Sequence, residues 1–129
     1  MRAIDTNVVV RILVADDPGQ TEKATAVVEA GNAFVSATVI LECEWVLRSA
    51  YGLSRDQVLH GLRHFAGLRG VVVENPSRLS QALDLAAEGV DLADALHLVG
   101  AEGCTAFLSF DRRLRLAATG RSPIPVEEP

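Results

Sequence analysis

Several acidic residues stand where a carboxylate could take part in chemistry. Asp5 and Asp111 each follow a short apolar segment of the kind that forms a strand in an α/β protein. In open α/β sheets the functional cleft lies at the carboxyl ends of the strands, so we expect both side chains in one crevice. An Asp in this position also commonly caps the helix that follows. Taken singly, each of the two is better explained as a cap.

Asp91 and Asp94 lie three residues apart at the start of residues 91–101, a segment that is apolar almost all round and predicts a buried helix. The two side chains share one face of that helix. Asp91 is explained by the favourable interaction of an acid with the helix dipole. Asp94 is harder to explain, because a carboxylate in apolar surroundings is unfavourable unless it is paired or bound to metal. No Lys or Arg lies within one turn of it.

Glu42 and Glu44 flank the apolar stripe of one expected helix at comparable angles, so periodicity does not decide which of them faces the cleft. At least one is expected to be a solvated acid. The other would complete an all-oxygen site with Asp5, Asp94 and Asp111. Mg²⁺ and Mn²⁺ prefer such ligands, whereas Zn²⁺ would call for Cys or His. Carboxylates this close would raise one another's pKa unless a cation neutralised them.

The elements that must position these acids alternate between short strands and helices. This alternation predicts an α/β fold: a single domain, residues 1–129, with a central, mainly parallel sheet flanked by helices on both faces. The expected strands are residues 1–4, 33–36, 71–73 and 105–110, with the proline-containing tail 123–126 as an edge strand. The expected helices are residues 8–13, 21–30, 38–50, 54–67, 76–88, 91–102 and 112–118.

Local signals refine this outline. Residues 16–19 are expected to form a turn, and Ser54 and Gln57 have the spacing of a capping box. The β-branched residues 71–73 predict a strand of the kind buried in parallel sheets. Cys43 and Cys104 lie in apolar runs, where cysteine usually behaves as a small buried hydrophobe, and we expect both to be reduced thiols.

The composition describes a compact chain, with 49% hydrophobic and 22% charged residues, which excludes a disordered protein. No apolar run is long enough for a membrane span or a signal peptide, so we expect a cytoplasmic protein with no membrane partner. The net charge of −5 argues against a nucleic-acid partner. However, all basic residues except Lys23 are Arg, which suits phosphate, and bound cations would offset some acids. RNA binding therefore stays open.

Four segments in this order resemble a PIN domain, and their spacing resembles that of VapC toxins. The resemblance spans essentially the whole chain and rests on the residues at 5–7, 36–47, 91–96 and 108–111. One departure is Ser109, where many relatives carry Thr, but both residues offer a hydroxyl. The resemblance implies that the catalytic, metal-binding acids are Asp5, Glu42, Asp94 and Asp111. It thus selects Glu42 over Glu44 and makes Asp91 a neighbour of the site.

This resemblance also implies a function. It implies an endoribonuclease that uses Mg²⁺ or Mn²⁺ and a metal-activated water to hydrolyse RNA, leaving a 5′-phosphate. VapC toxins further imply a VapBC toxin-antitoxin pair, in which a VapB-like antitoxin blocks the cleft, and a homodimer. Two alternatives stay open: a PIN-fold nuclease outside any toxin-antitoxin system, and a catalytically silent acidic binding module.

A different enzyme class also places an Asp directly after the first strand. Phosphatases that form an aspartyl-phosphate do so, as do receiver domains of this length, but both are expected to carry a Lys late in the chain. The only lysine is Lys23, in an early helix. The lack of a late lysine therefore argues against this interpretation.

Other residues have two interpretations each. Arg112, Arg113 and Arg115 either steer the RNA backbone or form a solvated helix face, and the sequence favours neither. Asn7 either contacts a metal-bound water or, slightly better, caps the first helix. His60 and His64 lack the Glu of a zinc motif and are expected at the surface. A core or boundary position is expected for His97, and a core or dimer-interface position for Trp45, Tyr51 and Phe65.

Overall fold

The computed structural model describes all residues, Met1–Pro129. The chain divides into two compact units, Met1–Asn75 and Pro76–Pro129. Each unit has its own helices, its own parallel strands and its own buried residues. We therefore describe each unit by itself.

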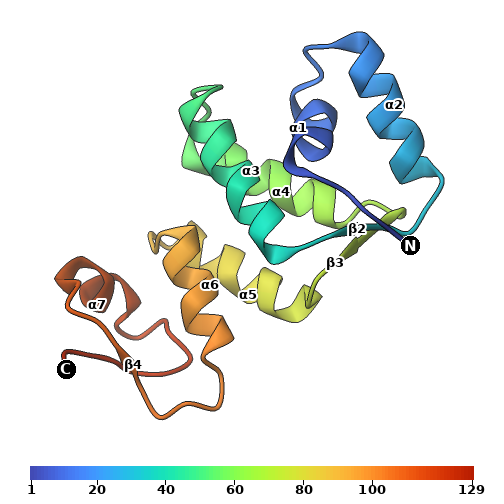
Figure 1. Ribbon diagram of the computed structural model, residues 1–129. Coiled ribbons are helices and arrows are strands. Elements are labelled where there is room, and N and C mark those ends of the chain that lie inside the picture. The colour runs from blue at the N-terminus through green and yellow to red at the C-terminus, as the bar shows by residue number, and fades with distance from the viewer. The chain divides into compact units, whose positions relative to one another are not determined.

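The N-terminal unit contains a three-stranded parallel sheet and four helices (Figure 1). The strand order is β1-β2-β3, with Arg2 opposite Ala33 and Ala33 opposite Val71. Helix α1 packs against α2 and α3, and α3 packs against α4. The elements are β1 (Arg2–Ala3), α1 (Thr6–Val14), α2 (Pro18–Glu29), β2 (Ala33–Val35), α3 (Ala37–Ser49), α4 (Arg55–Ala66) and β3 (Val71–Val73).

The C-terminal unit contains three helices and a two-stranded parallel sheet. Its first two helices pack against each other, and its last helix contacts the last strand. The elements are α5 (Pro76–Ala87), α6 (Leu92–Gly100), β4 (Phe107–Leu108), α7 (Arg112–Ala118) and β5 (Val126–Glu127).

The α/β class and the parallel pairing are thus confirmed, with two small sheets in place of one central sheet. The reason lies in how β4 satisfies its backbone groups. The amide of Phe107 donates to the carbonyl of Pro125 at 2.8 Å, and that of Ser109 donates to Glu127 at 2.9 Å. The C-terminal tail is therefore a strand, as predicted, and its partner is β4.

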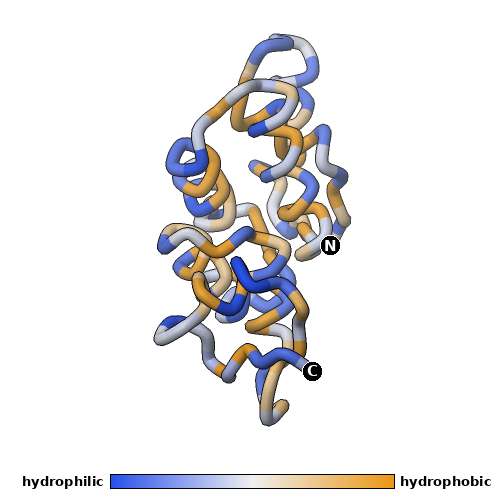
Figure 2. The backbone as a smooth tube through the Cα atoms, turned by 90° about the vertical axis from the view of Figure 1, so that its left-hand side faces the viewer, coloured by the Kyte–Doolittle hydropathy of each residue, from blue (hydrophilic) through white to orange (hydrophobic).

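The apolar stripes of the helices supply the core of each unit. Figure 2 shows hydrophobic and hydrophilic positions alternating along the helical turns, as expected for helices with one buried face. The largest fully buried side chains of the N-terminal unit are Val9, Val35, Ile40, Cys43, Leu47, Val58, Leu62 and Phe65, and those of the C-terminal unit are Leu83, Val90 and Leu98. The core prediction for Phe65 is confirmed.

Helix starts follow capping residues, and one of them corrects the sequence analysis. The capping box of Ser54 and Gln57 is confirmed at the start of α4. The expected turn at residues 16–19 is wrong in its second half, because α2 begins at Pro18. Asp17 caps this helix by accepting the amide of Gln20 at 3.0 Å, and proline is favourable in the first helical position.

Three predictions about burial and length also differ from the structure. Strand β3 is half-buried, because it forms an edge of its sheet. Strand β4 is shorter than the expected 105–110, since Gly103 (φ 90°) turns the chain before it and Asp111 already caps α7 after it. For the same reason Cys104 is exposed and not buried, whereas Cys43 is buried, and both are free thiols.

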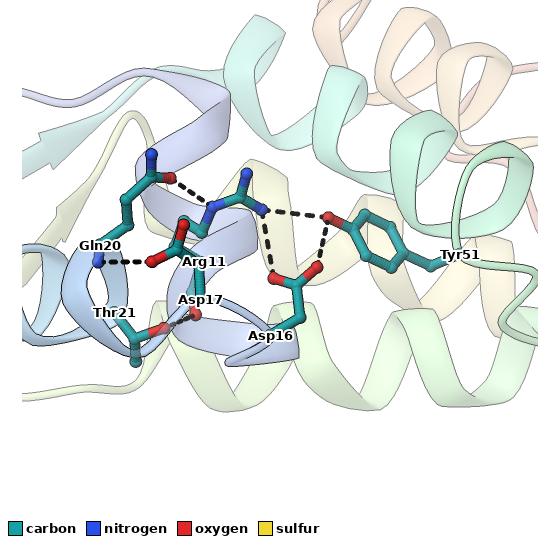
Figure 3. A network of polar contacts seen from close by, with 6 residues as sticks. All are labelled: Arg11, Asp16, Asp17, Gln20, Thr21 and Tyr51. Atoms are coloured by element: carbon teal, nitrogen blue, oxygen red, sulfur yellow. Dashed lines mark hydrogen bonds and ion pairs between the residues drawn. The ribbon is translucent and has the colours of Figure 1, made fainter.

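A polar network fixes α1 relative to α2 and to the segment after α3 (Figure 3). The Arg11 guanidinium donates to Asp16 at 3.3 Å and to the Tyr51 hydroxyl at 3.1 Å. Tyr51 in turn donates to Asp16 at 3.3 Å, and the Thr21 hydroxyl donates to the carbonyl of Arg11 at 3.2 Å. These contacts hold the C-terminal part of α1 in place.

A close backbone approach gives a first prediction. A Cβ on Gly70 would lie 1.7 Å from the carbonyl oxygen of Val28, which is far inside van der Waals contact. Gly70→Ala is therefore expected to lower the free energy of unfolding by about 2 kcal/mol or more, measured by urea denaturation.

Gly61→Ala in α4 is the matched control, because a Cβ there meets only Leu13 methyl groups at 3.8 Å. This variant is expected to be as stable as the wild type or up to about 1 kcal/mol more stable. Equal stability of Gly70→Ala and the wild type would contradict the close approach of Gly70 to the backbone of Val28.

Candidate functional site

Asp5 lies at the turn between β1 and α1 and caps the helix. Its Oδ1 accepts the amide of Thr6 at 2.8 Å, and its backbone is extended, with φ −90° and ψ 167°. The side chain is exposed. The capping explanation is therefore correct for Asp5, but it occupies Oδ1 and leaves Oδ2 free of hydrogen bonds.

Glu42, on α3, lies beside this turn. The hydroxyl of Thr6 donates to Oε1 of Glu42, and the thiol of Cys43 lies 3.9 Å from the carbonyl oxygen of Thr6, as a weak donor. Burial, followed by the negative charges of Glu42 and Asp5, raises the pKa of Cys43 to about 12, so the thiol stays protonated. The N-terminal unit thus brings Asp5 and Glu42 to one place.

Glu44 has a different environment. It is 8% exposed, and its carboxylate accepts from the guanidinium of Arg48 one turn later, with 3.4 Å between Nη2 and Oε2. A buried charge paired in this way is satisfied by its partner. Glu44 therefore has a structural role as the ion-pair partner of Arg48. Sequence periodicity could not distinguish Glu44 from Glu42.

In the C-terminal unit two aspartates cap helices. Oδ1 of Asp91 accepts the amides of Ala93 at 3.0 Å and Asp94 at 3.4 Å at the start of α6. Oδ1 of Asp111 accepts the amides of Arg113 at 2.9 Å and Leu114 at 3.1 Å at the start of α7. Asp91, for which the sequence predicted only a favourable interaction with the helix dipole, is thus the N-cap of α6, and Oδ2 of Asp111 makes no hydrogen bond.

Asp94 lies in the first turn of α6 and is half-buried. Burial raises its pKa, the charge of Asp91 raises it further, His97 lowers it and the charge of Asp111 raises it. Asp94 makes no ion pair, in agreement with the absence of a nearby Lys or Arg in the sequence. The charges of Asp94 and Asp111 therefore repel each other, and no Lys or Arg forms an ion pair with either carboxylate.

Helix α6 is less buried than its apolar sequence predicts. Its buried residues, Leu92, Ala95, Leu98 and Val99, form one face, and His97 is exposed on another. The expectation of a helix buried all round is therefore wrong. The ring of His97 stacks on Phe107, with centroids 6.4 Å apart and 13° between the ring planes.

The four acids selected by the family resemblance thus fall into two pairs, Asp5 with Glu42 and Asp94 with Asp111. Neither unit contains a group of three or more His, Cys, Asp or Glu side chains placed to hold a metal ion. Each pair consists of oxygen donors only, a set that suits a hard divalent cation. No Lys or Arg forms an ion pair with any of the four.

The three arginines that follow Asp111 differ in their contacts. Arg115 is held by its own unit, donating to the carbonyl of Ser109 at 3.0 Å and lying 3.7 Å from Glu128, whereas Arg112 and Arg113 are exposed and make no ion pair. Asn7 does not cap α1, because Asp5 does so, and it lies exposed within the helix. Trp45 is 60% exposed and is not a core residue.

A comparison with known protein families matches residues 3–120 to the PIN domain. The chain belongs to the PIN domain family. PIN domains are typically nucleases and generally use divalent metals, so this PIN domain has a nuclease fold. The match extends over most of both units.

No curated protein gives a significant match to the chain. None of the helices combines the length and the apolar character that crossing a bilayer requires.

Sequence reasoning missed one residue of this PIN domain, Thr6. It is 6% exposed, and its hydroxyl links the Asp5 turn to Glu42, a residue far away in the chain. A threonine after a strand-ending Asp is common in turns, and the sequence holds no signal for its long-range partner.

Glu74 follows β3, as Asp5 follows β1. Its carboxylate accepts the amide of Ala37 at 3.1 Å at the start of α3.

The raised pKa of Asp94 gives a second prediction. An acid whose folded pKa lies above its ordinary value of 3.8 destabilises the fold once it ionises, so the metal-free protein loses stability as pH rises through that raised pKa. Asp94→Asn removes this effect. It is expected to stabilise the metal-free protein at neutral pH by less than about 1 kcal/mol, because solvent screens a half-buried group.

The measurement is urea denaturation of both proteins in chelator from acid to neutral pH. Asp56→Asn, which changes an exposed acid in the first turn of α4, is the control and should bring no gain in stability. A loss of stability in Asp94→Asn at neutral pH would contradict the repulsion inferred among Asp91, Asp94 and Asp111.

Proposed function

We propose that this PIN domain is an endoribonuclease that depends on Mg²⁺ or Mn²⁺ and hydrolyses RNA phosphodiester bonds. The observation that carries the proposal is the state of the four acids Asp5, Glu42, Asp94 and Asp111. All are carboxylates at the positions that the family resemblance selects, and none is neutralised by an arginine, whereas the neighbouring Glu44 is. Unpaired carboxylates of this kind are ready ligands for a divalent cation.

In this proposal each pair of acids supplies ligands for a divalent cation. A bound divalent cation would supply an activated water and relieve the charge on the phosphate oxygens. Asp5 and Asp111 would bind through Oδ2, because backbone amides hold Oδ1 in place. Glu42 would bind through Oε2, since Thr6 donates to Oε1. Three ligands would thus be oriented before the cation arrives.

Arg112 and Arg113 would guide the RNA backbone. They directly follow Asp111, are exposed and have no acidic partner, so their guanidinium groups are available to phosphate. Arg115 would contribute less, because it already binds Ser109 and Glu128. With water as the nucleophile, the cleaved RNA would carry a 5′-phosphate.

The resemblance to VapC toxins supports a finer proposal. The protein would be the toxin of a VapBC pair, act in the cytoplasm as a homodimer, and be inhibited by a VapB-like antitoxin. Trp45, an exposed aromatic residue on α3, is of the type enriched at protein interfaces. A PIN nuclease outside a toxin-antitoxin system is the alternative at this level.

A second candidate is a catalytically silent acidic module. The observation in its favour is that Asp5, Asp91 and Asp111 all cap helices, which is a structural role. Asparagine caps helices about as well as aspartate does. Substitution by asparagine therefore separates the two candidates, because it preserves the caps and removes the charge.

RNA cleavage by acid variants is the third prediction. The wild type is expected to cleave a pool of cellular RNAs when Mn²⁺ is present, and cleavage is expected to stop when a chelator is added. Each neutral variant should lose about 100-fold or more in rate, because each removes a carboxylate that would hold the cation, and the cation would relieve the charge of the transition state. The rates are measured by sequencing new 5′ ends over time for Asp5→Asn, Glu42→Gln, Asp94→Asn and Asp111→Asn.

Two controls accompany this series. Asp91→Asn keeps the cap of α6 and should keep most of the activity. Glu44→Gln disturbs a buried ion pair and should lower stability while leaving the cleavage rate of the folded protein near that of the wild type. Cleavage that persists in chelator, or in the four neutral variants, would overturn the nuclease mechanism and favour the silent module.

The fourth prediction concerns the toxin assignment. Expression of the wild type in a bacterial host is expected to arrest growth, and Asp5→Asn should not. Coexpression of a small DNA-binding protein encoded beside this chain should restore growth of the wild type. Active RNA cleavage in vitro with no effect on growth would instead place the protein among PIN nucleases outside toxin-antitoxin systems.

A further inference from the structure

Thr6 is the first residue of α1 and one of the two buried polar or charged residues of the chain. Its hydroxyl donates to the carboxylate of Glu42, which is exposed and lies 36 residues later. The hydroxyl must be the donor, because an ionised carboxylate only accepts. A buried donor thus holds an exposed acid.

Two other threonine hydroxyls donate to backbone groups and not to an acid. Thr21 donates to the carbonyl of Arg11 at 3.2 Å, and Thr119, the C-cap of α7, donates to the carbonyl of Arg115 at 2.7 Å. Thr6 contacts an ionised side chain, and hydrogen bonds to ionised groups are about twice as strong as neutral ones.

The contact restricts a flexible side chain. A free glutamate populates many rotamers, and ordering it on binding opposes association. The Thr6 hydroxyl fixes Oε1 of Glu42 at the Asp5 turn, while the amide of Thr6 itself fixes Oδ1 of Asp5 at 2.8 Å. One residue therefore orients both acids of the pair, through its backbone and its side chain.

We propose that Thr6 is a positioning residue for the cation site: it holds Glu42 beside Asp5 so that the two free carboxylate oxygens bind one divalent cation. This inference rests on the proposed metal-dependent function and deepens it. Loss of a hydrogen bond that orients a ligand typically weakens metal binding by about 10-fold to 100-fold. Thr6→Val, which keeps the shape of the side chain, should show such a loss.

The experiment measures Mn²⁺ binding to the purified full chain by calorimetry, without RNA. Thr6→Val is expected to bind Mn²⁺ about 10-fold or more weakly than the wild type, and Thr6→Ser should restore the affinity. In RNA cleavage, Thr6→Val should need correspondingly more Mn²⁺ for half-maximal rate, with a rate at saturating Mn²⁺ close to that of the wild type. A merely structural role would not shift the Mn²⁺ requirement in this way.

Thr21→Val is the matched control, because it removes a half-buried hydroxyl from the same unit without touching an acid. It should bind Mn²⁺ as the wild type does. If Thr6→Val does not fold, Thr6→Cys takes its place, since a thiol is close to serine in size and a weak donor. Thr6→Cys should then bind Mn²⁺ more weakly than Thr6→Ser.

The outcomes are distinguishable. Wild-type affinity in Thr6→Val or Thr6→Cys overturns the positioning role and leaves the nuclease proposal standing. A wild type that binds no Mn²⁺ overturns the metal site itself and this inference with it. A weakened variant that Thr6→Ser restores supports both.

Discussion

Uncompensated negative charge is the constraint on which this PIN domain depends. Carboxylates that approach one another without a cationic partner raise one another's pKa, and the pKa of Asp94 is raised first by burial and then by the charges of Asp91 and Asp111. The chain has eleven arginines, and it does use one of them to neutralise Glu44. Asp5, Glu42, Asp94 and Asp111 have no such partner, and oxygen ligands of this kind suit the divalent cation that we propose.

The backbone fixes these charges in place. Asp5 and Asp111 end a strand-to-helix turn, and in both the first amides of the next helix bind Oδ1. Helix capping and metal binding are often treated as competing explanations of such a residue. Here they are compatible, because a carboxylate has two oxygens and the cap uses one. The same amides that start the helix aim the second oxygen.

Much of this could be predicted from the sequence. Periodicity, capping signals and β-branched runs predict every helix and strand to within a few residues, because these are local properties. The predictions of burial were wrong where the neighbouring elements determine how exposed a residue is. Cys104 is exposed because a glycine turn precedes it, and β3 is half-buried because it is an edge strand.

The residues of the proposed site were predicted only in part from local sequence signals. Residue types and their place after strands indicated Asp5, Asp94 and Asp111, whereas the choice of Glu42 over Glu44 came from the family resemblance. The structure distinguishes the environments of the two glutamates, since Glu44 is paired with Arg48 and Glu42 accepts from Thr6, and the role of Glu42 in the site stays a prediction. Contacts between residues so far apart in the chain leave no mark in a single sequence.

The central proposal is that Asp5, Glu42, Asp94 and Asp111 are ligands of a divalent cation, and paramagnetic broadening by Mn²⁺ tests it most directly. In an amide NMR spectrum of the full chain, substoichiometric Mn²⁺ is expected to broaden the signals next to these acids, at Thr6, Cys43, Ala95 and Arg112. Broadening confined to one unit, or spread over exposed acids such as Glu22 and Glu29, would contradict the claim.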